Sequence, residues 1–388
     1  MKRSAEVVII GGGINGCSIA YNLSKENIDT VLVEKGSLAN GATGRSGAMI
    51  WNMWSQGHDK ELAMIGTSAA KKFAELEEEL DYDIEYAPSD SLLLVAPGQE
   101  EDYRKAMANV EKNLGISIEY LEPEAIEKVA PYIDVANNPV VGGYHFLNHP
   151  LYAGANPFYT VEALTTNAKR AGAKICTYTQ VTGIEVEKGK IESILTTKGK
   201  INTHIVINAA GAWSSDVAQM AGIKIPTMPY RDEAFITEPL EPLPYLADCE
   251  NMWSRQTKNG QIIAGEEIVP NREPGYNAEA SLGVLERTAH TMQQYIPKLG
   301  NVNILRHWGG FEDITPDELP IAGEVDELKG LILACGCNGF GFCFSQALGK
   351  LIADLIIRQE ECKVMEYFNL RRFKREYREY PGRWCDWL

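Results

Sequence analysis

The sequence predicts an α/β fold with an α+β insert: a parallel, doubly wound sheet of the nucleotide-binding kind and a second, smaller antiparallel-sheet module. Residues 6–10 form an uninterrupted apolar run, as a buried parallel strand does, and a glycine turn leads from them into an apolar-faced segment at 14–25. A second apolar run at 30–33 completes a strand–turn–helix–strand unit. Strands that end in glycine return at 204–211 and after 330, so distant parts of the chain contribute to one sheet.

The other elements are predicted from periodicity and from turn residues. Helices are expected at 59–80, 101–114, 123–129, 158–171, 280–295 and 344–359. Strands are expected at 91–96, in a β-rich stretch with Lys-Gly turns at 174–201, and between proline-rich turns at 225–267. Residues 132–157, with many Gly, Pro, Asn and aromatic residues, are predicted to be irregular.

Composition excludes several classes of protein. The 388 residues hold 37 Lys and Arg against 53 Asp and Glu, a net charge of −16, which does not suit a nucleic-acid binder. No apolar run reaches the ~18 residues of a membrane span. The N-terminus resembles a signal peptide superficially, but glycines interrupt its apolar stretch, so it is interpreted as structure. Eight cysteines are too sparse for a disulfide scaffold, and a cytoplasmic location is expected.

A glycine-rich phosphate cradle follows the first strand. Gly11 allows a tight turn, Gly13 lets backbone N–H groups approach a diphosphate, and Gly16 lets helix and strand pack closely. Glu34 ends the next strand and suits a ribose hydroxyl. An ordinary turn is the alternative, and the cradle alone does not separate NAD from FAD. The run of residues 36–47, with backbone N–H groups, hydroxyls and Arg45, favours a second contact with a long dinucleotide over a surface loop.

Five motifs in order resemble the D-amino-acid-oxidase-like superfamily of FAD-dependent oxidoreductases. They are VVIIGGGINGCSIAYNL with TVLVEK, GATGRSG, GANPFYTVEALTTNAKRAGA, VINAAGAWS, and HWGGFEDITPDELPIAG followed by GLILACGCNGFGFCFSQALGKLIADLI. The sequence is most similar to the β-type catalytic subunits of sarcosine oxidase, dye-linked proline and D-hydroxyproline dehydrogenase, opine oxidase and hydrogen cyanide synthase. The resemblance implies a Rossmann-type FAD domain of the glutathione-reductase-like kind at 1–80, 150–220 and 325–375, a substrate or cap domain at 81–149 and 221–324, and a tail at 376–388.

The resemblance also implies which residues hold FAD. Gly11, Gly13, Gly16 and Glu34 would hold the ADP half, and Thr43, Gly44, Arg45 and Ser46 would follow the diphosphate toward the flavin. Val181 would meet the adenine through its backbone, and Ala210, Gly211 and Trp213 would lie beside the cofactor. Gly336, Asn338, Gly339, Phe340 and Gly341 would reach the O2 side of the flavin. The cofactor-binding set is completed by Ile14, Asn15, Lys35, Ala42, Gly47 and Gly310.

Several residues differ from the family pattern, and these differences change what is expected of flavin attachment, carboxylate binding and reaction with oxygen. The positions of covalent flavin attachment correspond to Gly310 and Asn156, which cannot form the usual bonds, so noncovalent FAD is expected. Trp51 and Cys343 stand where related enzymes have an Arg and a Lys for the substrate carboxylate, and Ile263 stands at the lysine that promotes reaction with oxygen. These departures put the usual carboxylate clamp and efficient oxidase activity in doubt.

Four residues are predicted to act on the substrate: Trp51, Trp308, Arg255 and His149. The tryptophans would form walls of an apolar, aromatic pocket, which favours the neutral amine; core packing is the alternative for each. Arg255 is the candidate for a substrate carboxylate, against a surface ion pair. His149 would orient substrate, against a structural histidine.

The cysteines Cys335, Cys337 and Cys343 match no common metal-ligand spacing and are expected to be small buried residues beside the cofactor, so no metal is predicted. The basic, aromatic tail from Tyr367 suits either docking to a partner subunit or a solvated helix.

The predicted function is oxidation of the C–N bond of a small amino acid or secondary amine by hydride transfer to flavin N5. The chain is expected to be the catalytic subunit of a multisubunit dehydrogenase, whose partners would be a second flavoprotein or a ferredoxin-like subunit. Two alternatives stay open: a stand-alone oxidase that uses oxygen, and a noncatalytic flavin-binding assembly subunit.

Overall fold

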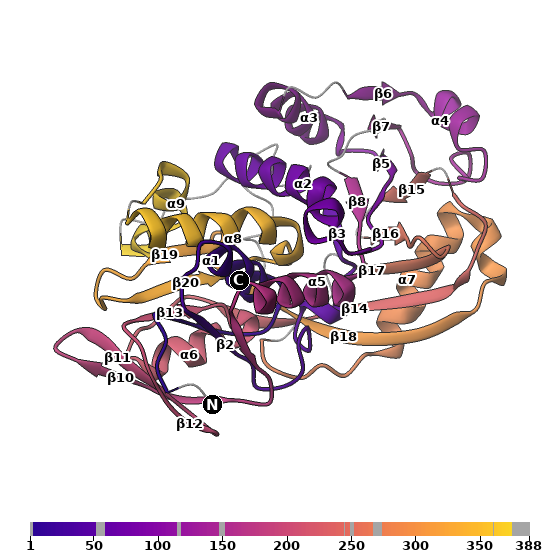
Figure 1. Cartoon of the computed structure of the whole chain (residues 1–388). Coiled ribbons are helices and arrows are strands. Elements are labelled where there is room, and N and C mark those ends of the chain that lie inside the picture. The colour runs from indigo at the N-terminus through magenta and orange to yellow at the C-terminus, as the bar shows by residue number, and fades with distance from the viewer. Residues whose placement is uncertain are drawn as a thin grey trace.

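The computed structural model describes residues 3–51, 59–114, 118–146, 152–243, 245–248, 252–266, 274–359 and 361–374. Its central element is a six-stranded sheet in the order β19-β20-β13-β1-β2-β9 (Figure 1). All neighbouring strands are parallel except β19, which runs antiparallel to β20. The strands are β1 (Val7–Ile10), β2 (Thr30–Val33), β9 (Lys174–Cys176), β13 (Ile205–Asn208), β19 (Ile321–Glu324) and β20 (Leu331–Cys335).

The two faces of this sheet are covered by different structures (Figure 1). Val7 and Ile9 pack into a core with the helices α1 (Ile14–Lys25), α2 (Lys60–Leu80), α5 (Pro157–Arg170) and α8 (Gly341–Arg358). Val8 and Ile10 pack on the other face, against β10 (Val181–Glu187), β11 (Lys190–Thr196), β12 (Gly199–Asn202) and α6 (Ser214–Met220). Both faces of β1 are therefore buried, which is why its sequence is continuously apolar.

A four-stranded antiparallel sheet lies beside this unit, in the order β16-β17-β14-β18. Its strands are β14 (Met228–Pro239), β16 (Met252–Gln256), β17 (Gln261–Glu266) and β18 (Ile304–Ile314), and α7 (Leu282–Tyr295) packs on it. A second sheet, β15-β5-β7-β6, holds β5 (Asp90–Val95), β6 (Glu119–Leu121), β7 (Gly142–Phe146) and β15 (Tyr245–Asp248). The short strands β3 (Met49–Trp51), β4 (Ala87–Pro88) and β8 (Tyr152–Gly154) form a third.

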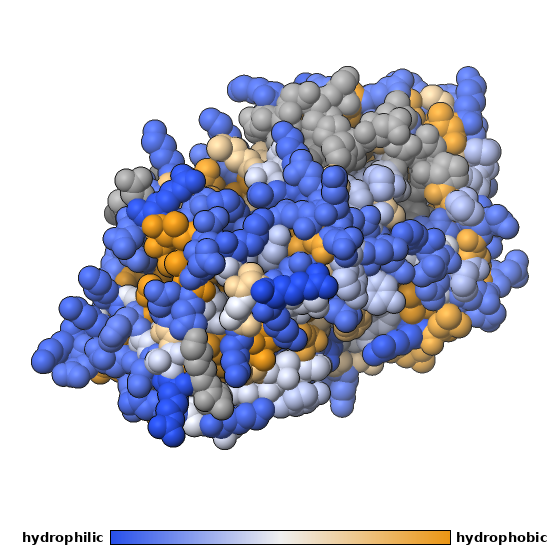
Figure 2. Space-filling model, in the orientation of Figure 1, coloured by the Kyte–Doolittle hydropathy of each residue, from blue (hydrophilic) through white to orange (hydrophobic). Residues whose placement is uncertain are grey.

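The remaining described elements are one longer helix, two short helices and four 3-10 turns. They are α3 (Glu100–Leu114), α4 (Pro123–Val129), α9 (Lys363–Phe368) and the 3-10 turns η1 (Thr43–Arg45), η3 (Gly211–Trp213), η4 (Pro297–Asn301) and η5 (Leu370–Lys374). The face in Figure 2 is mostly hydrophilic, and its apolar residues form scattered groups. Among the described residues, no helix has the length and apolar character needed to span a membrane.

The predicted fold class is confirmed, with three local differences. The prediction that residues 132–157 are irregular was wrong, because β7 and β8 form there and pair with β5 and β3. The helix expected to begin at residue 344 begins at Gly341. Strand β19 joins the central sheet although the domain prediction placed residues up to 324 in the cap. The division into two domains stays a prediction.

Candidate active site

One cavity of about 830 Å³ runs between the carboxyl ends of the central strands and the four-stranded sheet. Of the residues predicted to bind the cofactor, all but Gly16 and Gly44 line it. The lining members are Gly11, Gly13, Ile14, Asn15, Glu34, Lys35, Ala42, Thr43, Arg45, Ser46, Gly47, Val181, Ala210, Gly211, Trp213, Gly310, Gly336, Asn338, Gly339, Phe340 and Gly341. Residues from distant parts of the sequence thus meet at one place, although their individual roles in binding stay predictions.

Two of the three glycines in the cradle have no room for a side chain. Gly11 has φ +116°, and a Cβ there would lie 2.3 Å from the carbonyl oxygen of Ala209. A Cβ on Gly16 would lie 2.1 Å from the carbonyl oxygen of Gly11. Gly16 therefore acts behind the cavity, by letting α1 close onto the turn, and leaves the N-terminus of α1 directed at the cavity, where a diphosphate is favoured.

Glu34 closes the other side of the cradle. Its carboxylate accepts hydrogen bonds from the backbone N–H groups of Gly12 and Gly36, both at 2.7 Å. An ionised carboxylate has about four acceptor positions, so two remain for hydroxyl groups of a ligand. This arrangement fits a ribose and gives the cradle a fixed orientation.

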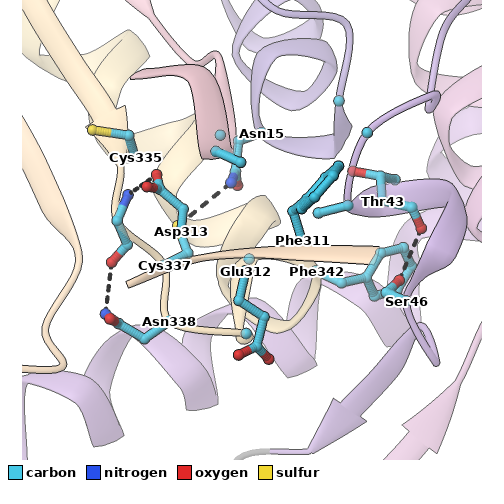
Figure 3. A pocket seen from close by; sticks show the side chains of 18 of the residues that line it. Asn15, Thr43, Ser46, Phe311, Glu312, Asp313, Cys335, Cys337, Asn338 and Phe342 are labelled. Carbon is cyan, nitrogen blue, oxygen red and sulfur yellow. Dashed lines mark hydrogen bonds between the residues drawn. The ribbon is translucent and has the colours of Figure 1, made fainter. Parts of the chain in front are cut away.

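Segment 40–47 lies against the start of α1. The backbone N–H of Ile14 donates to Oγ1 of Thr43 at 3.0 Å. The Thr43 side chain therefore accepts from one of the N–H groups at the start of α1 that have no partner within the helix. Ser46 Oγ donates to the Thr43 carbonyl at 2.8 Å (Figure 3). The guanidinium of Arg45 donates to the carbonyls of Asn40 and Gly41. Arg45 thus stabilises its own loop.

An aromatic group borders the cavity near Glu34. The Lys35 ammonium lies 3.2 Å from the ring centre of Trp213, a cation–π contact. Tyr276 stacks on Trp213 with ring centres 5.5 Å apart, and its hydroxyl donates to Asp216 at 2.7 Å. Partial burial lowers the pKa of Lys35, while Glu34 and Asp216 oppose this shift.

Another wall of the cavity is formed by Asp313 and by the loop that precedes α8 (Figure 3). Oδ2 of Asp313 accepts from the Gly336 N–H at 2.6 Å, and its carbonyl accepts from the Asn338 N–H at 3.0 Å. Asn338 in turn accepts from the Thr315 N–H at 2.8 Å. These bonds attach the end of β18 to the loop, whose residues Gly336 and Asn338 both have positive φ. Asp313 was not among the predicted site residues.

Asp313 is a buried carboxyl group with an incomplete set of partners. It is 7% exposed, and within the described residues its Oδ1 accepts no hydrogen bond. Burial raises its pKa to about 7, although the Gly336 N–H and the nearby Thr227 hydroxyl act in the opposite direction.

Asp313 is expected to make the cofactor-free chain less stable as the pH rises. Its pKa is higher in the folded chain than in the unfolded chain, so its stabilising contribution is complete below pH ~4 and is lost as the pH rises through about 7. Asp313→Asn changes the free energy of unfolding by one amount at pH 5 and by another at pH 8. We expect the change at pH 8 to be more stabilising than the change at pH 5 by about 1–3 kcal/mol. Urea unfolding of both proteins at the two pH values measures this. An equal effect at both would contradict it.

The four residues predicted to act on the substrate have different placements. Arg255 is buried and does not line the cavity: its guanidinium donates to the carbonyls of Gly47 and of Ala155, the latter at 3.0 Å. Trp308 also lies outside the cavity lining, and its Nε1 donates to the Arg45 carbonyl at 2.8 Å. Trp51 ends β3, but its side chain is outside the described part, as is His149.

Arg255 has a structural role in the chain, and its predicted contact with a substrate carboxylate stays a prediction. It joins strand β16 to two neighbouring segments, and burial lowers its pKa to about 10. The sequence could not show this, because the guanidinium finds its carbonyl partners through tertiary contacts with residues about 100 and 208 positions away.

Several apolar residues line the cavity next to segment 40–47. A Cβ on Gly47 would lie 2.6 Å from the Trp253 ring, and the Cys343 thiol donates to the Met49 carbonyl at 2.9 Å. Leu62 and Phe342 also line the cavity, as do Asp102, Lys105 and Asn109 of α3. The last three were not predicted, because α3 has the pattern of an ordinary amphipathic surface helix. The cysteines Cys335, Cys337 and Cys343 are buried free thiols that line the cavity. In the described part of the chain, no cluster of three or more His, Cys, Asp or Glu side chains could hold a metal ion.

Comparisons with known proteins agree with this geometry. The family model described as "DAO: FAD dependent oxidoreductase" matches residues 6–355. The chain is 29% identical over 385 residues to the sarcosine oxidase subunit beta of an Arthrobacter species, covering 96% of this chain and 92% of that protein. It is 27% identical to human mitochondrial sarcosine dehydrogenase, of which it covers only 43%.

A solved structure is also similar. The L-proline dehydrogenase from P. horikoshii superposes with a TM-score of 0.88 and 29% identity, over 97% of this chain and 99% of that one. The glycines of the cradle leave space for a dinucleotide, and the lining residues supply N–H groups and hydroxyl acceptors that suit FAD. This protein therefore belongs to the DAO family of FAD-dependent oxidoreductases.

Proposed function

We propose that this chain oxidises the C–N bond of a small amino acid or secondary amine. The observation that carries the proposal is the continuity of the cavity, which runs from the cradle at Gly13 and Glu34 to an end lined by Met49, Leu62 and Trp253. The cofactor fills one part, and the other part has the apolar walls that a small substrate needs. The named activities of the similar proteins, on sarcosine and L-proline, support this substrate class.

The chain's own residues would position the substrate and keep its amine neutral. Bound FAD would supply the hydride acceptor. Apolar surroundings disfavour the charged ammonium, so the site selects the neutral amine, whose lone pair assists loss of a hydride. The N-terminus of α8, which begins at Gly341 on the cavity wall, provides a partial positive charge that favours negative charge on a bound flavin.

FAD is proposed to be bound without a covalent link. Gly310 lines the cavity but has no nucleophilic side chain. Asn156 does not line it: its Oδ1 caps α5 by accepting from the N–H groups of Phe158 and Tyr159. Burial raises the pKa of the Cys337 thiol to about 12, so this nearby sulfur stays protonated and a poor nucleophile.

The chain is further proposed to work with partner subunits, a second flavoprotein or a ferredoxin-like protein. A similar protein is itself named a β subunit, which supports this. The tail after Lys374 lies outside the described residues, so its proposed docking rests on its basic and aromatic sequence. The free thiols of the described cysteines suit a reducing compartment such as the cytoplasm.

Anaerobic addition of amines to the FAD-loaded protein tests the proposal. We expect sarcosine, L-proline or a related N-alkyl amino acid to bleach the visible absorbance of the flavin, and colour to return slowly in air. Fast return with formation of peroxide would identify a stand-alone oxidase. Absence of bleaching with glycine, sarcosine, D- and L-proline, hydroxyproline and opines would contradict the proposal and favour a noncatalytic flavin-binding subunit.

A further inference from the structure

The cavity needs a cation if its substrate carries a carboxylate. Among the described residues that line it, three have a basic side chain: Lys35, Arg45 and Lys105. Lys35 lies over the Trp213 ring, and Arg45 is held by the carbonyls of its own loop. Both side chains are therefore engaged with neighbouring groups of the protein.

Lys105 comes from α3, which packs on α2 and lies away from strand β2, where Glu34 follows (Figure 1). Asp102, Lys105 and Asn109 are spaced by three and four residues, so they share one face of α3, and all three line the cavity. The lining also includes Met49 and Leu62, the latter from α2, the helix that packs against α3. One polar face of α3 thus contributes to the cavity lining.

The Lys105 ammonium forms only a weak ion pair within the protein. It lies 3.3 Å from Glu101 Oε1, and the two side chains are 61% and 58% exposed. Glu101 also forms a closer pair with Arg104, at 2.8 Å. Exposed pairs of this kind contribute little, so a substrate carboxylate can replace Glu101 at Lys105 at small cost.

We infer that the Lys105 ammonium, with the Asn109 amide one turn further along α3, binds the carboxylate of the amino-acid substrate. Lys105 is thus a residue that selects amino acids over simple amines. The inference rests on the proposed function, because it assigns a residue to that substrate. It also provides the carboxylate partner that Arg255, with its guanidinium on backbone carbonyls, does not offer.

The test is anaerobic flavin reduction in the FAD-loaded protein, with the apparent dissociation constant measured for sarcosine and for its methyl ester. We expect Lys105→Met to weaken sarcosine binding about three- to fivefold, the effect of losing one largely exposed ion pair. The ester, which lacks the carboxylate, should change less than about twofold. Lys105→Arg should restore most of the affinity for sarcosine, and Glu101→Gln should tighten it, because a competing carboxylate is removed.

Lys112→Met is the matched control, since Lys112 is on the same helix but does not line the cavity. It should leave both constants unchanged. If Lys105→Met leaves sarcosine unchanged, or weakens the ester as much as sarcosine, the inference is overturned while the proposed function stands. If no amino acid reduces the flavin of the unmodified protein, both fail together.

Discussion

Replacing Gly11 by alanine is expected to abolish FAD binding, with at least a hundredfold loss of affinity. The added Cβ would lie 2.3 Å from the Ala209 oxygen and 2.8 Å from the Ala209 carbonyl carbon, both backbone atoms that cannot turn away. Either the turn or Ala209, which follows β13, must move, and both line the cavity. Titration of the cofactor-free protein with FAD, followed by flavin fluorescence, measures the loss.

Gly172→Ala is the matched control for this prediction. Gly172 has φ +103°, close to the +116° of Gly11, but a Cβ there has no atom within 4 Å. Gly172→Ala therefore introduces only the backbone strain, roughly 1–3 kcal/mol of unfolding free energy, and no contact with a backbone atom like that at Gly11. We expect it to bind FAD normally. Equal loss of FAD binding in both variants would show that strain, rather than the shape of the cradle, is responsible.

Gly349→Ala is expected to destabilise the chain by separating the two helices that direct their N-termini at the cavity. The new Cβ would lie 2.1 Å from Oγ and 2.8 Å from Cβ of Ser18, where α8 crosses α1. Overpacking costs about 1–3 kcal/mol or more, which must exceed the ~1 kcal/mol that alanine gains over glycine within a helix. Chemical denaturation should show a net loss of unfolding free energy.

Two variants isolate the cause. Gly283→Ala places the same substitution in α7, where the nearest atom is 3.7 Å away on the flexible Arg287 side chain, and it should be neutral or stabilising. Ser18→Gly combined with Gly349→Ala removes the two closest contacts, leaves the Ser18 carbonyl carbon 2.9 Å from the new Cβ, and should restore part of the stability. A destabilised Gly283→Ala, or a double variant no better than Gly349→Ala, would refute the proposed contact.

Local motifs predicted the cradle well because their residues act close together in the sequence. Gly11, Gly13 and Glu34 belong to one strand–turn–helix–strand unit, so spacing alone places them together. For the loop at Gly336–Gly341, the sequence pattern predicts a glycine turn after a strand, and the family resemblance assigns its residues to the cofactor. Its helix begins three residues earlier than expected because glycine at the first helical position weakens the periodic signal.

The placement of three charged residues could not be predicted in this way. Arg255 has the sequence context of a ligand-binding cation, but tertiary contacts direct its guanidinium to backbone carbonyls. Lys105 has the context of a solvated helix, and only the packing of α3 beside α2 brings it to the cavity. Asp313 is one of many acidic residues, and its burial depends on the register between β18 and β14.

The central claim is that this cavity holds one FAD without a covalent bond. Acid precipitation of the purified protein, with flavin measured in the supernatant and the pellet, tests it directly. We expect one FAD per chain, all of it released to the supernatant, and restored binding when the cofactor-free chain is given FAD. A colourless protein that refuses FAD but takes up NAD, or flavin that stays with the pellet, would contradict it.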